Sequence, residues 1–169
     1  QRGHVEISGG TIKKAEGKNG GAGIGGGSGA GATVKISNGT IGSWDSYTHT
    51  AKESDGAFGS GGAVGGGAGI GSGAEASSDT TVTISGGTIY NAVGSNGGAG
   101  IGTGYGSQSN ANITINGNST VNAVGDSGAA IGSGSEEGIS NPSTGKPNTF
   151  KTIISITNSN VTASSGESA

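Results

Sequence analysis

The sequence predicts an all-β protein, a parallel β-helix of about four to five coils, from two alternating phrases and their near-constant spacing. The first phrase has the form Val-x-Ile-Ser-Gly-Gly-Thr-Ile, and its copies lie at residues 5–12, 34–41, 82–89, 113–121 and 154–161. The second is Gly-Ala-Gly-Ile-Gly or a close variant, and its copies lie at residues 21–25, 67–71, 98–102 and 128–132. A base period of about 30 residues is typical of a chain that coils and stacks on itself, and we expect a right-handed coil.

The first phrase is expected to form one strand and one bend in each coil. Apolar and polar side chains alternate in residues 82–85, so Val82 and Ile84 are expected to face the core. The two glycines that follow permit a bend with positive φ, after which Ile89 faces inward again. Stacked copies predict three inward ladders: Val5/Val34/Val82/Ile113/Ile154, Ile7/Ile36/Ile84/Ile115/Ile156 and Ile12/Ile41/Ile89/Val121/Val161.

The second phrase is expected to add a third side to each coil. Its Ala and Ile are two positions apart, so both are expected to face the core, with the glycines leaving the outer surface bare. The predicted ladders are Ile24/Ile70/Ile101/Ile131 and Ala22/Ala68/Ala99/Ala129. Helices are not expected, because no pattern with a period of 3.6 residues is present and each helical Gly costs about 1 kcal/mol relative to Ala.

Outward positions are expected to form polar ladders along the axis. The two predicted ladders are Ser8/Ser37/Ser85/Asn116/Thr157 and Thr11/Thr40/Thr88/Thr120/Asn160. Stacked hydroxyls and amides can hydrogen-bond along a solenoid. The threonine row also fits an ice-binding surface loosely, although it is a single row and its last member is Asn160.

Composition limits the class of protein. The chain has 169 residues, expected to form one solenoid module over residues 1–169, with 41 glycines and 28% hydrophobic residues. A thin core extended along an axis needs fewer large residues than a spherical one. The net charge of −3 is thinly scattered, so no nucleic-acid partner is expected, and no apolar run is long enough to insert into a membrane. Cysteine is absent, which excludes disulfides and thiolate metal sites.

The ends of the sequence lie close to repeats, so we expect the module to be a piece of a longer protein. Open ends of a solenoid expose unpaired strands, and end-to-end self-association is therefore expected. Copies of the first phrase are spaced unevenly, and the two long intervals predict loop insertions at residues 42–66 and 133–149. Insertions in solenoids project as loops, often on a functional face.

The first insertion carries the candidate ligand-binding residues Trp44, Asp45, Tyr47 and His49. Aromatic rings stack on the apolar faces of sugars, and nearby polar groups bind their hydroxyls. Tyr90 and Tyr105 would add rings if the third coil lies beside the insertion. The alternative is that Trp44 and Phe58 fold back and pack the loop onto a glycine-rich wall, and both interpretations stay open.

The sequence lacks the residue motifs that are typical of catalytic, cofactor-binding and metal-binding sites. Gly21, Gly23 and Gly26 match the spacing of a dinucleotide fingerprint, but no helix follows, so no cofactor is expected. The glycine-rich phrase lacks the Asp of calcium-binding nonapeptides, so no metal site is expected. No Cys or Gly-x-Ser-x-Gly nucleophile is present, and Glu136 and Glu137 are adjacent rather than opposed. We expect no enzyme, although a cleft lined by two or more carboxylates would favour a polysaccharide-active one.

The alternation of Ile-Ser-Gly-Gly-Thr-Ile with Gly-Gly-Ala-Gly-Ile-Gly-Gly-Gly resembles the β-helical repeats of large extracellular proteins from Gram-positive bacteria, described as adhesins or carbohydrate-binding surface proteins. The resemblance covers nearly all of the chain outside the insertions. It implies an extracellular or cell-surface location and host or environmental glycans as partners, and it assigns no functional residues. The expected function is a non-catalytic adhesin, carbohydrate-binding or stalk segment, with a polysaccharide-active enzyme and an ice-binding solenoid as alternatives.

Overall fold

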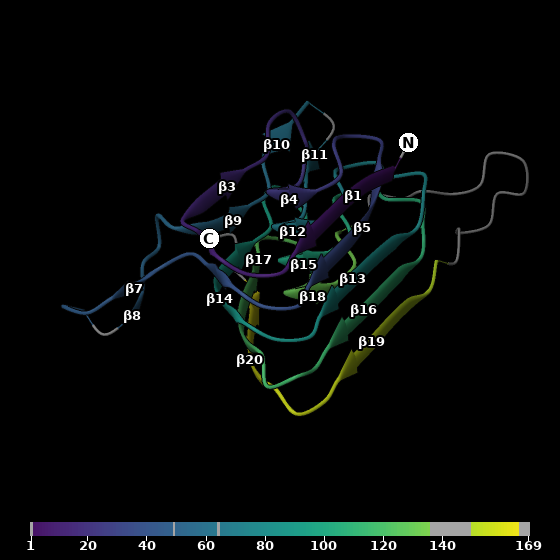
Figure 1. Cartoon of the computed structure of the whole chain (residues 1–169). Coiled ribbons are helices and arrows are strands. Elements are labelled where there is room, and N and C mark those ends of the chain that lie inside the picture. The colour runs from purple at the N-terminus through teal and green to yellow at the C-terminus, as the bar shows by residue number, and fades with distance from the viewer. Residues whose placement is uncertain (1, 49, 64, 136–149, 166–169) are drawn as a thin grey trace, which may run out of the picture.

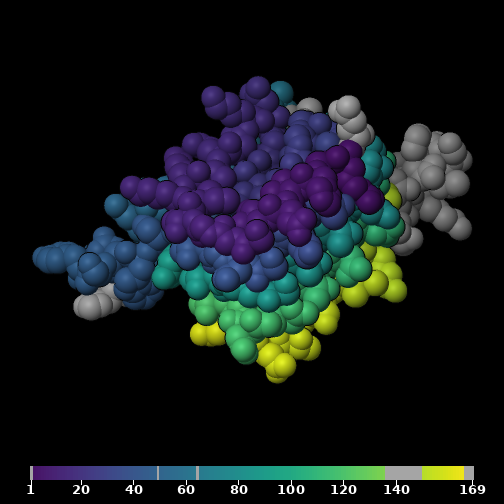
Figure 2. Space-filling view, in the orientation of Figure 1, coloured from purple at the N-terminus to yellow at the C-terminus, as the bar shows by residue number. Residues whose placement is uncertain are grey.

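The chain forms a parallel β-helix in the computed structural model, which describes residues 2–48, 50–63, 65–135 and 150–165 (Figure 1). Three parallel sheets run along the axis, and each of the first four coils contributes to all of them. The coils stack in chain order, from the purple N-terminal coil to the yellow C-terminal one (Figure 2). The predicted fold class is therefore confirmed.

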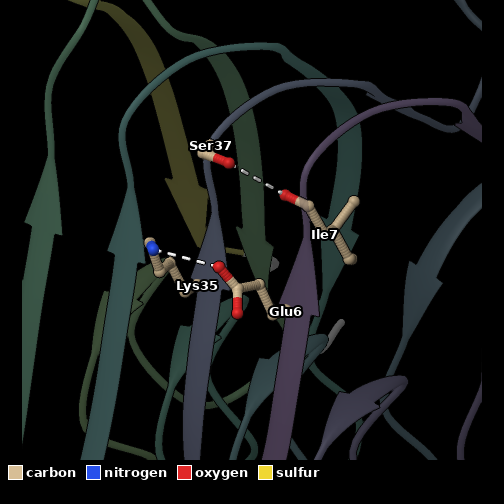
Figure 3. Close-up of polar contacts among 4 residues, drawn as sticks. All are labelled: Glu6, Ile7, Lys35 and Ser37. Atoms are coloured by element: carbon tan, nitrogen blue, oxygen red, sulfur yellow. Dashed lines mark hydrogen bonds and ion pairs between the residues drawn. The ribbon is translucent and has the colours of Figure 1, made fainter.

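Sheet A is built from the Val-x-Ile part of each first phrase. Its strands, in spatial order, are β1 (Arg2–Ile7), β5 (Gly31–Ile36), β13 (Thr80–Ile84), β16 (Ala111–Ile115) and β19 (Thr152–Ile156). The register pairs Val34 with Val5 and Val82, so the first two predicted ladders are confirmed. On the outer face, Lys35 Nζ lies 3.0 Å from Glu6 Oε1 across β1 and β5 (Figure 3).

Sheet B follows the bend and continues each coil. Its strands are β2 (Thr11–Ile12), β3 (Lys14–Glu16), β6 (Thr40–Ile41), β9 (Gly56–Phe58), β14 (Thr88–Val93), β17 (Thr120–Gly125) and β20 (Asn160–Ser165). The register confirms the third apolar ladder and the threonine row. It also reveals an alanine ladder not expected from the two phrases: Ala15/Ala57/Ala92/Ala123/Ala163.

Sheet C is formed by the second phrase in two-residue strands. These are β4 (Ile24–Gly25), β12 (Ile70–Gly71), β15 (Ile101–Gly102) and β18 (Ile131–Gly132). The isoleucine ladder is confirmed, and Ile70 and Ile101 are fully buried. The predicted alanine ladder does not face the core along its length: Ala68 and Ala99 are buried outside the main apolar cluster, Ala22 is half-buried and Ala129 is exposed.

The glycines of the second phrase allow close stacking, which corrects the expectation of a bare outer surface. Gly67 and Gly98 are buried, and a Cβ on either would collide with a backbone carbonyl group of the preceding coil. In the middle of the phrase, a Cβ on Gly69 or Gly100 would meet backbone atoms of sheet B. The glycine-rich part of each coil is thus pressed against both neighbouring coils and the opposite sheet, where any side chain would separate them.

The segment expected as one insertion at residues 42–66 is divided into two antiparallel hairpins by a strand of the solenoid. The first hairpin contains β7 (Trp44–Asp45) and β8 (Thr50–Ala51), and the second contains β10 (Gly61–Gly62) and β11 (Gly65–Gly66). Between them, β9 pairs with β3 and β14 in sheet B. The β7–β8 hairpin projects from the side of the solenoid (Figure 1). Most of the other predicted insertion, residues 136–149, lies outside the described residues.

Candidate functional site

The β7–β8 hairpin is anchored where β14 carries an irregularity. The register of β14 against β17 shifts between Ile89 and Ala92, so β14 has one residue more than its partner in this stretch. The extra residue lies opposite the gap in the second coil where the hairpin leaves β6 and returns to β9. Tyr90 and Asn91 lie at this bulge, and their side chains contact the hairpin from the third coil.

Asn91 clamps the base of the hairpin to the solenoid. Its side chain is 7% exposed, and its Nδ2 donates hydrogen bonds to the carbonyl oxygens of Lys52, at 2.9 Å, and Asp55, at 3.0 Å. Its Oδ1 accepts a bond of 3.3 Å from Asn122 Nδ2 in the next coil. Three connections from one buried amide tie the returning arm of the hairpin to two coils.

Asp55 stabilises the same base from within the hairpin. Ser43 Oγ donates to Asp55 Oδ2 at 2.6 Å, and Ser54 Oγ donates to Oδ1 at 3.0 Å. The hydrogen bond from Ser43 lowers the pKa of Asp55 below its ordinary value, against the opposing effect of burial and with help from Ser54. Asp55 therefore joins the departing and returning arms in its charged form near neutral pH.

Trp44 and Tyr90 form an aromatic pair at the side of sheet B. Their ring centroids are 5.9 Å apart with the planes at 40°, and Trp44 keeps 50% of its surface exposed. Trp44 therefore packs on a tyrosine of the third coil rather than on a glycine-rich wall. The pair lies at a groove of about 340 Å³ whose polar lining includes Thr120, Asn122, Asn160 and Thr162.

The other predicted site residues lie apart from this groove or serve the hairpin itself. Asp45 Oδ1 accepts hydrogen bonds from the backbone N–H groups of Tyr47, at 2.8 Å, and Thr48, at 3.1 Å, and these lower the pKa of Asp45. Its carboxylate thus shapes the hairpin turn. Tyr47 is 92% exposed and does not line the groove, and His49 lies outside the described residues. Tyr105 lies against Gly65 and Gly97, so it adds no ring to the groove.

The groove continues along the outer face of sheet B beyond the aromatic pair. A middle stretch shares Thr50, Ala51 and Asn122 with the Trp44 end. It shares Glu53, Val93 and Val124 with a wider end of about 490 Å³. We call these the Trp44 end and the Phe58 end, because Phe58 of β9 lines the second. Phe58 belongs to a strand of the solenoid and faces outward beside the groove.

A third repeated phrase in the sequence could have predicted β9 and the residues of this end of the groove. Segments of the form x-Ala-x-Gly occur in sheet B at residues 14–17, 56–59, 91–94 and 122–125, and the same form also occurs at residues 62–65 and 129–132. The alanines of the sheet B segments form the buried ladder, and the residue after each of them faces the groove side of sheet B. The phrase is short and its outward residue varies, being Glu16, Phe58, Val93 and Val124, so it is easily missed.

The threonine row proposed for ice binding forms part of this groove at one end. Thr120 and Asn160, the last two members of the row, line the Trp44 end together with Tyr90. The row is therefore not a flat surface free along its length.

Comparison with known proteins supports the repeat architecture. A family model described as a beta helix repeat matches residues 5–28, 82–105 and 113–135. The three matches fall on three of the stacked coils and agree with the parallel β-helix of the structure. The second coil, which carries both hairpins, is the long interval between the first two matches. No curated protein and no solved structure matches the chain.

Two further features limit the chemistry of the described part of the chain. It contains no group of three or more His, Cys, Asp or Glu side chains placed to hold a metal ion. No helix within it is long and apolar enough to cross a membrane. The site is thus described by the groove, its aromatic rings and its polar rim.

Proposed function

We propose that this β-helix is a non-catalytic carbohydrate-binding segment of an extracellular or cell-surface protein, and that a glycan chain binds at the Trp44 end of the groove. The observation that carries the proposal is the half-exposed Trp44 ring, fixed against Tyr90 beside a wall of threonine and asparagine side chains. A sugar ring has an apolar C–H face and a rim of hydroxyls, and this groove offers an aromatic surface and hydrogen-bonding groups for both.

The hairpin anchor supports the proposal because binding needs a preorganised surface. Asn91 and Asp55 hold the hairpin on the solenoid through hydrogen bonds of 3.0 Å or shorter to its two arms. The opposite wall comes from β17 and β20, which are strands of the rigid coil. Ligand binding therefore costs less free energy for ordering the protein than binding to a mobile loop would cost.

Glycan binding by Trp44→Ala and Tyr47→Ala variants tests this function. On a glycan array followed by calorimetry, we expect the unmodified protein to bind at least one neutral oligosaccharide. Trp44→Ala is expected to weaken that binding about tenfold, because stacked area is lost at the centre of the site. Tyr47→Ala is the matched control, since its ring is exposed on the same hairpin but does not line the groove.

Two outcomes would contradict the proposal. Absence of binding to every glycan by the unmodified protein would remove the function. Equal losses in the Trp44→Ala and Tyr47→Ala variants would show that the hairpin tip rather than the groove makes the contact.

A polysaccharide-active enzyme is the second candidate, because carboxylates line the Phe58 end of the same groove. Glu16, Glu53 and Asp126 all line it, together with Lys14. Glycoside hydrolysis needs two carboxylates on opposite sides of a sugar. Release of reducing ends from the bound oligosaccharide, lost in a Glu53→Gln variant, would favour this candidate over the non-catalytic one.

A further inference from the structure

We propose that the Phe58 end of the groove is a second subsite, which takes a sugar unit bearing a protonated amine, as in an unacetylated amino-sugar chain. The inference rests on the proposed glycan-binding function and names the class of glycan. Three observations lead to it: an apolar floor, carboxylates without an ion pair, and continuity with the Trp44 end.

The floor of this subsite is apolar although it lies on the outer face of a sheet. Phe58, Val93 and Val124 stack in register across β9, β14 and β17, and all three are only partly buried. In the last coil the equivalent position is Ser164, and in the first it is Glu16. The apolar stretch is thus confined to the part of sheet B that the groove crosses.

The chain itself places a cation against this floor. Lys14 Nζ lies 5.7 Å from the centroid of the Phe58 ring and 3.1 Å from Glu16 Oε2. An ammonium between an aromatic face and a carboxylate is the arrangement that stabilises a bound amine through cation–π and ionic contacts. Lys14 therefore occupies the Phe58 ring and neutralises Glu16, so a ligand amine is expected at the other carboxylates of this end, Glu53 and Asp126.

The remaining carboxylates of this end are available to a ligand. Among the described residues, neither Glu53 nor Asp126 forms an ion pair, whereas Glu16 is paired with Lys14. Asp126 Oδ2 accepts one hydrogen bond, from the backbone N–H of Asn96 at 3.0 Å. Lys13 and Lys52 lie near Asp55, at the hairpin base, and neither lines the Phe58 end. The lining charges therefore favour a cationic occupant.

The two ends are joined along the direction of the strands. The groove follows β14 and the two residues after it, from Ile89 to Ser95, and β17 and the residue after it, from Thr120 to Asp126. This is a path of about 20 Å at the usual rise per strand residue. A chain several sugars long can thus stack on Trp44 at one end and place an amine near Glu53 and Asp126 at the other. The long reach and the sugar-sized aromatic surfaces favour a glycan over a short basic peptide as the occupant.

Calorimetry with three matched oligosaccharides tests the inference. The ligands are a glucosamine hexamer, its fully N-acetylated form and a neutral glucose hexamer, at mildly acidic pH where sugar amines are protonated. We expect the glucosamine hexamer to bind about fivefold more tightly than the others, and we expect the preference to shrink at high salt. Asp126→Asn and Glu53→Gln are each expected to reduce the preference for the glucosamine hexamer over the neutral hexamer by about half or more.

The matched control is Glu6→Gln, which removes the same charge from the outer face of sheet A. An equal effect of this variant would show that net charge, not the subsite, sets the preference. Binding of all three hexamers with equal affinity would overturn the inference and leave the proposed function standing. Absence of binding to any of them and to the glycan array would remove both. Tighter binding of a lysine hexapeptide than of the glucosamine hexamer would assign the Phe58 end to basic peptides.

Discussion

At the scale of single residues, the core contains one side chain whose chemistry does not match its surroundings. Thr80 is 1% exposed at an inward position of sheet A, paired with Ala111 in the next coil. Its Oγ1 is buried without a hydrogen-bond partner among the described residues. An unsatisfied buried hydroxyl lowers the free energy of unfolding by about 1–3 kcal/mol. This is a large loss for a protein with a thin core.

We therefore expect Thr80→Val to stabilise the protein by about 1 kcal/mol, because valine has the same shape without the hydroxyl. Thermal unfolding followed by circular dichroism measures the effect. The control is Thr81→Val, which alters the adjacent half-exposed side chain on the outer face and is expected to change stability little. A lower melting temperature for Thr80→Val would mean that the hydroxyl has a partner in solution.

At the scale of elements, the β7–β8 hairpin depends on a bulge in another coil. Its own ladder is short: among the described residues, Trp44 pairs with Ala51 and Asp45 with Thr50, and the Lys52 N–H donates to the Ser43 carbonyl oxygen at 2.8 Å. Two-stranded hairpins are marginal in isolation, so the contacts with Asn91 and Tyr90 decide whether the hairpin stays on the solenoid. The candidate site is thus assembled from the second coil and held by the third.

Asn91→Ala is expected to release the hairpin while leaving the solenoid folded. Two hydrogen bonds to backbone carbonyls are lost, a cost of about 1–3 kcal/mol confined to this element. Hydrogen exchange over residues 43–55 is expected to quicken, and Trp44 fluorescence to shift toward that of a solvated ring. Asn122→Ala is the control, because it removes only the 3.3 Å contact to Asn91. Unchanged exchange in the Asn91→Ala variant would assign the anchoring to Ser43 and Asp55 instead.

At the scale of the whole molecule, the coil that ends the described solenoid is apolar and open. Ile154 and Ile156 are 45% and 44% exposed, whereas Ile113 and Ile115 in the preceding coil are fully buried. Both belong to β19, and among the described strands β19 pairs with β16 alone, as β1 pairs with β5 alone at the other end of sheet A. The two ends present the same ladders in the same register, so one copy can continue the solenoid of another.

We expect the isolated module of residues 1–169 to associate end to end as its concentration rises, which analytical ultracentrifugation measures. The Ile154→Lys and Ile156→Lys double variant is expected to weaken the association at least tenfold by placing charges in the joint. Ile153→Lys is the matched control, since Ile153 is equally exposed on the same strand but faces outward. A protein that stays monomeric at high concentration, or an equal effect of Ile153→Lys, would contradict end-to-end stacking.

The sequence by itself determined the coil, its ladders and their register, because each rung of a solenoid repeats the same local environment. Val34, Val82 and Ile113 meet because the phrase places an inward side chain at the same offset in every copy. The concentration of aromatic residues in the second coil was also visible. It predicted a candidate site in this segment. In the structure Trp44 lines a groove, whereas Asp45 caps a turn and Tyr47 lies away from the groove.

Only the tertiary structure decided how the interruptions of the repeat contact the neighbouring coils. Asn91 and Tyr90 belong to an ordinary repeat, and their roles arise from a bulge that matches a gap one coil away. Phe58 returns to sheet B in the middle of a stretch that reads as one loop, because its neighbour Ala57 fills a place in a buried ladder. Such contacts depend on the stacking of residues from 31 positions apart (Asn91 and Asn122) to 46 positions apart (Trp44 and Tyr90). A repeat predicts such stacking for identical positions but not for the interruptions that form the groove.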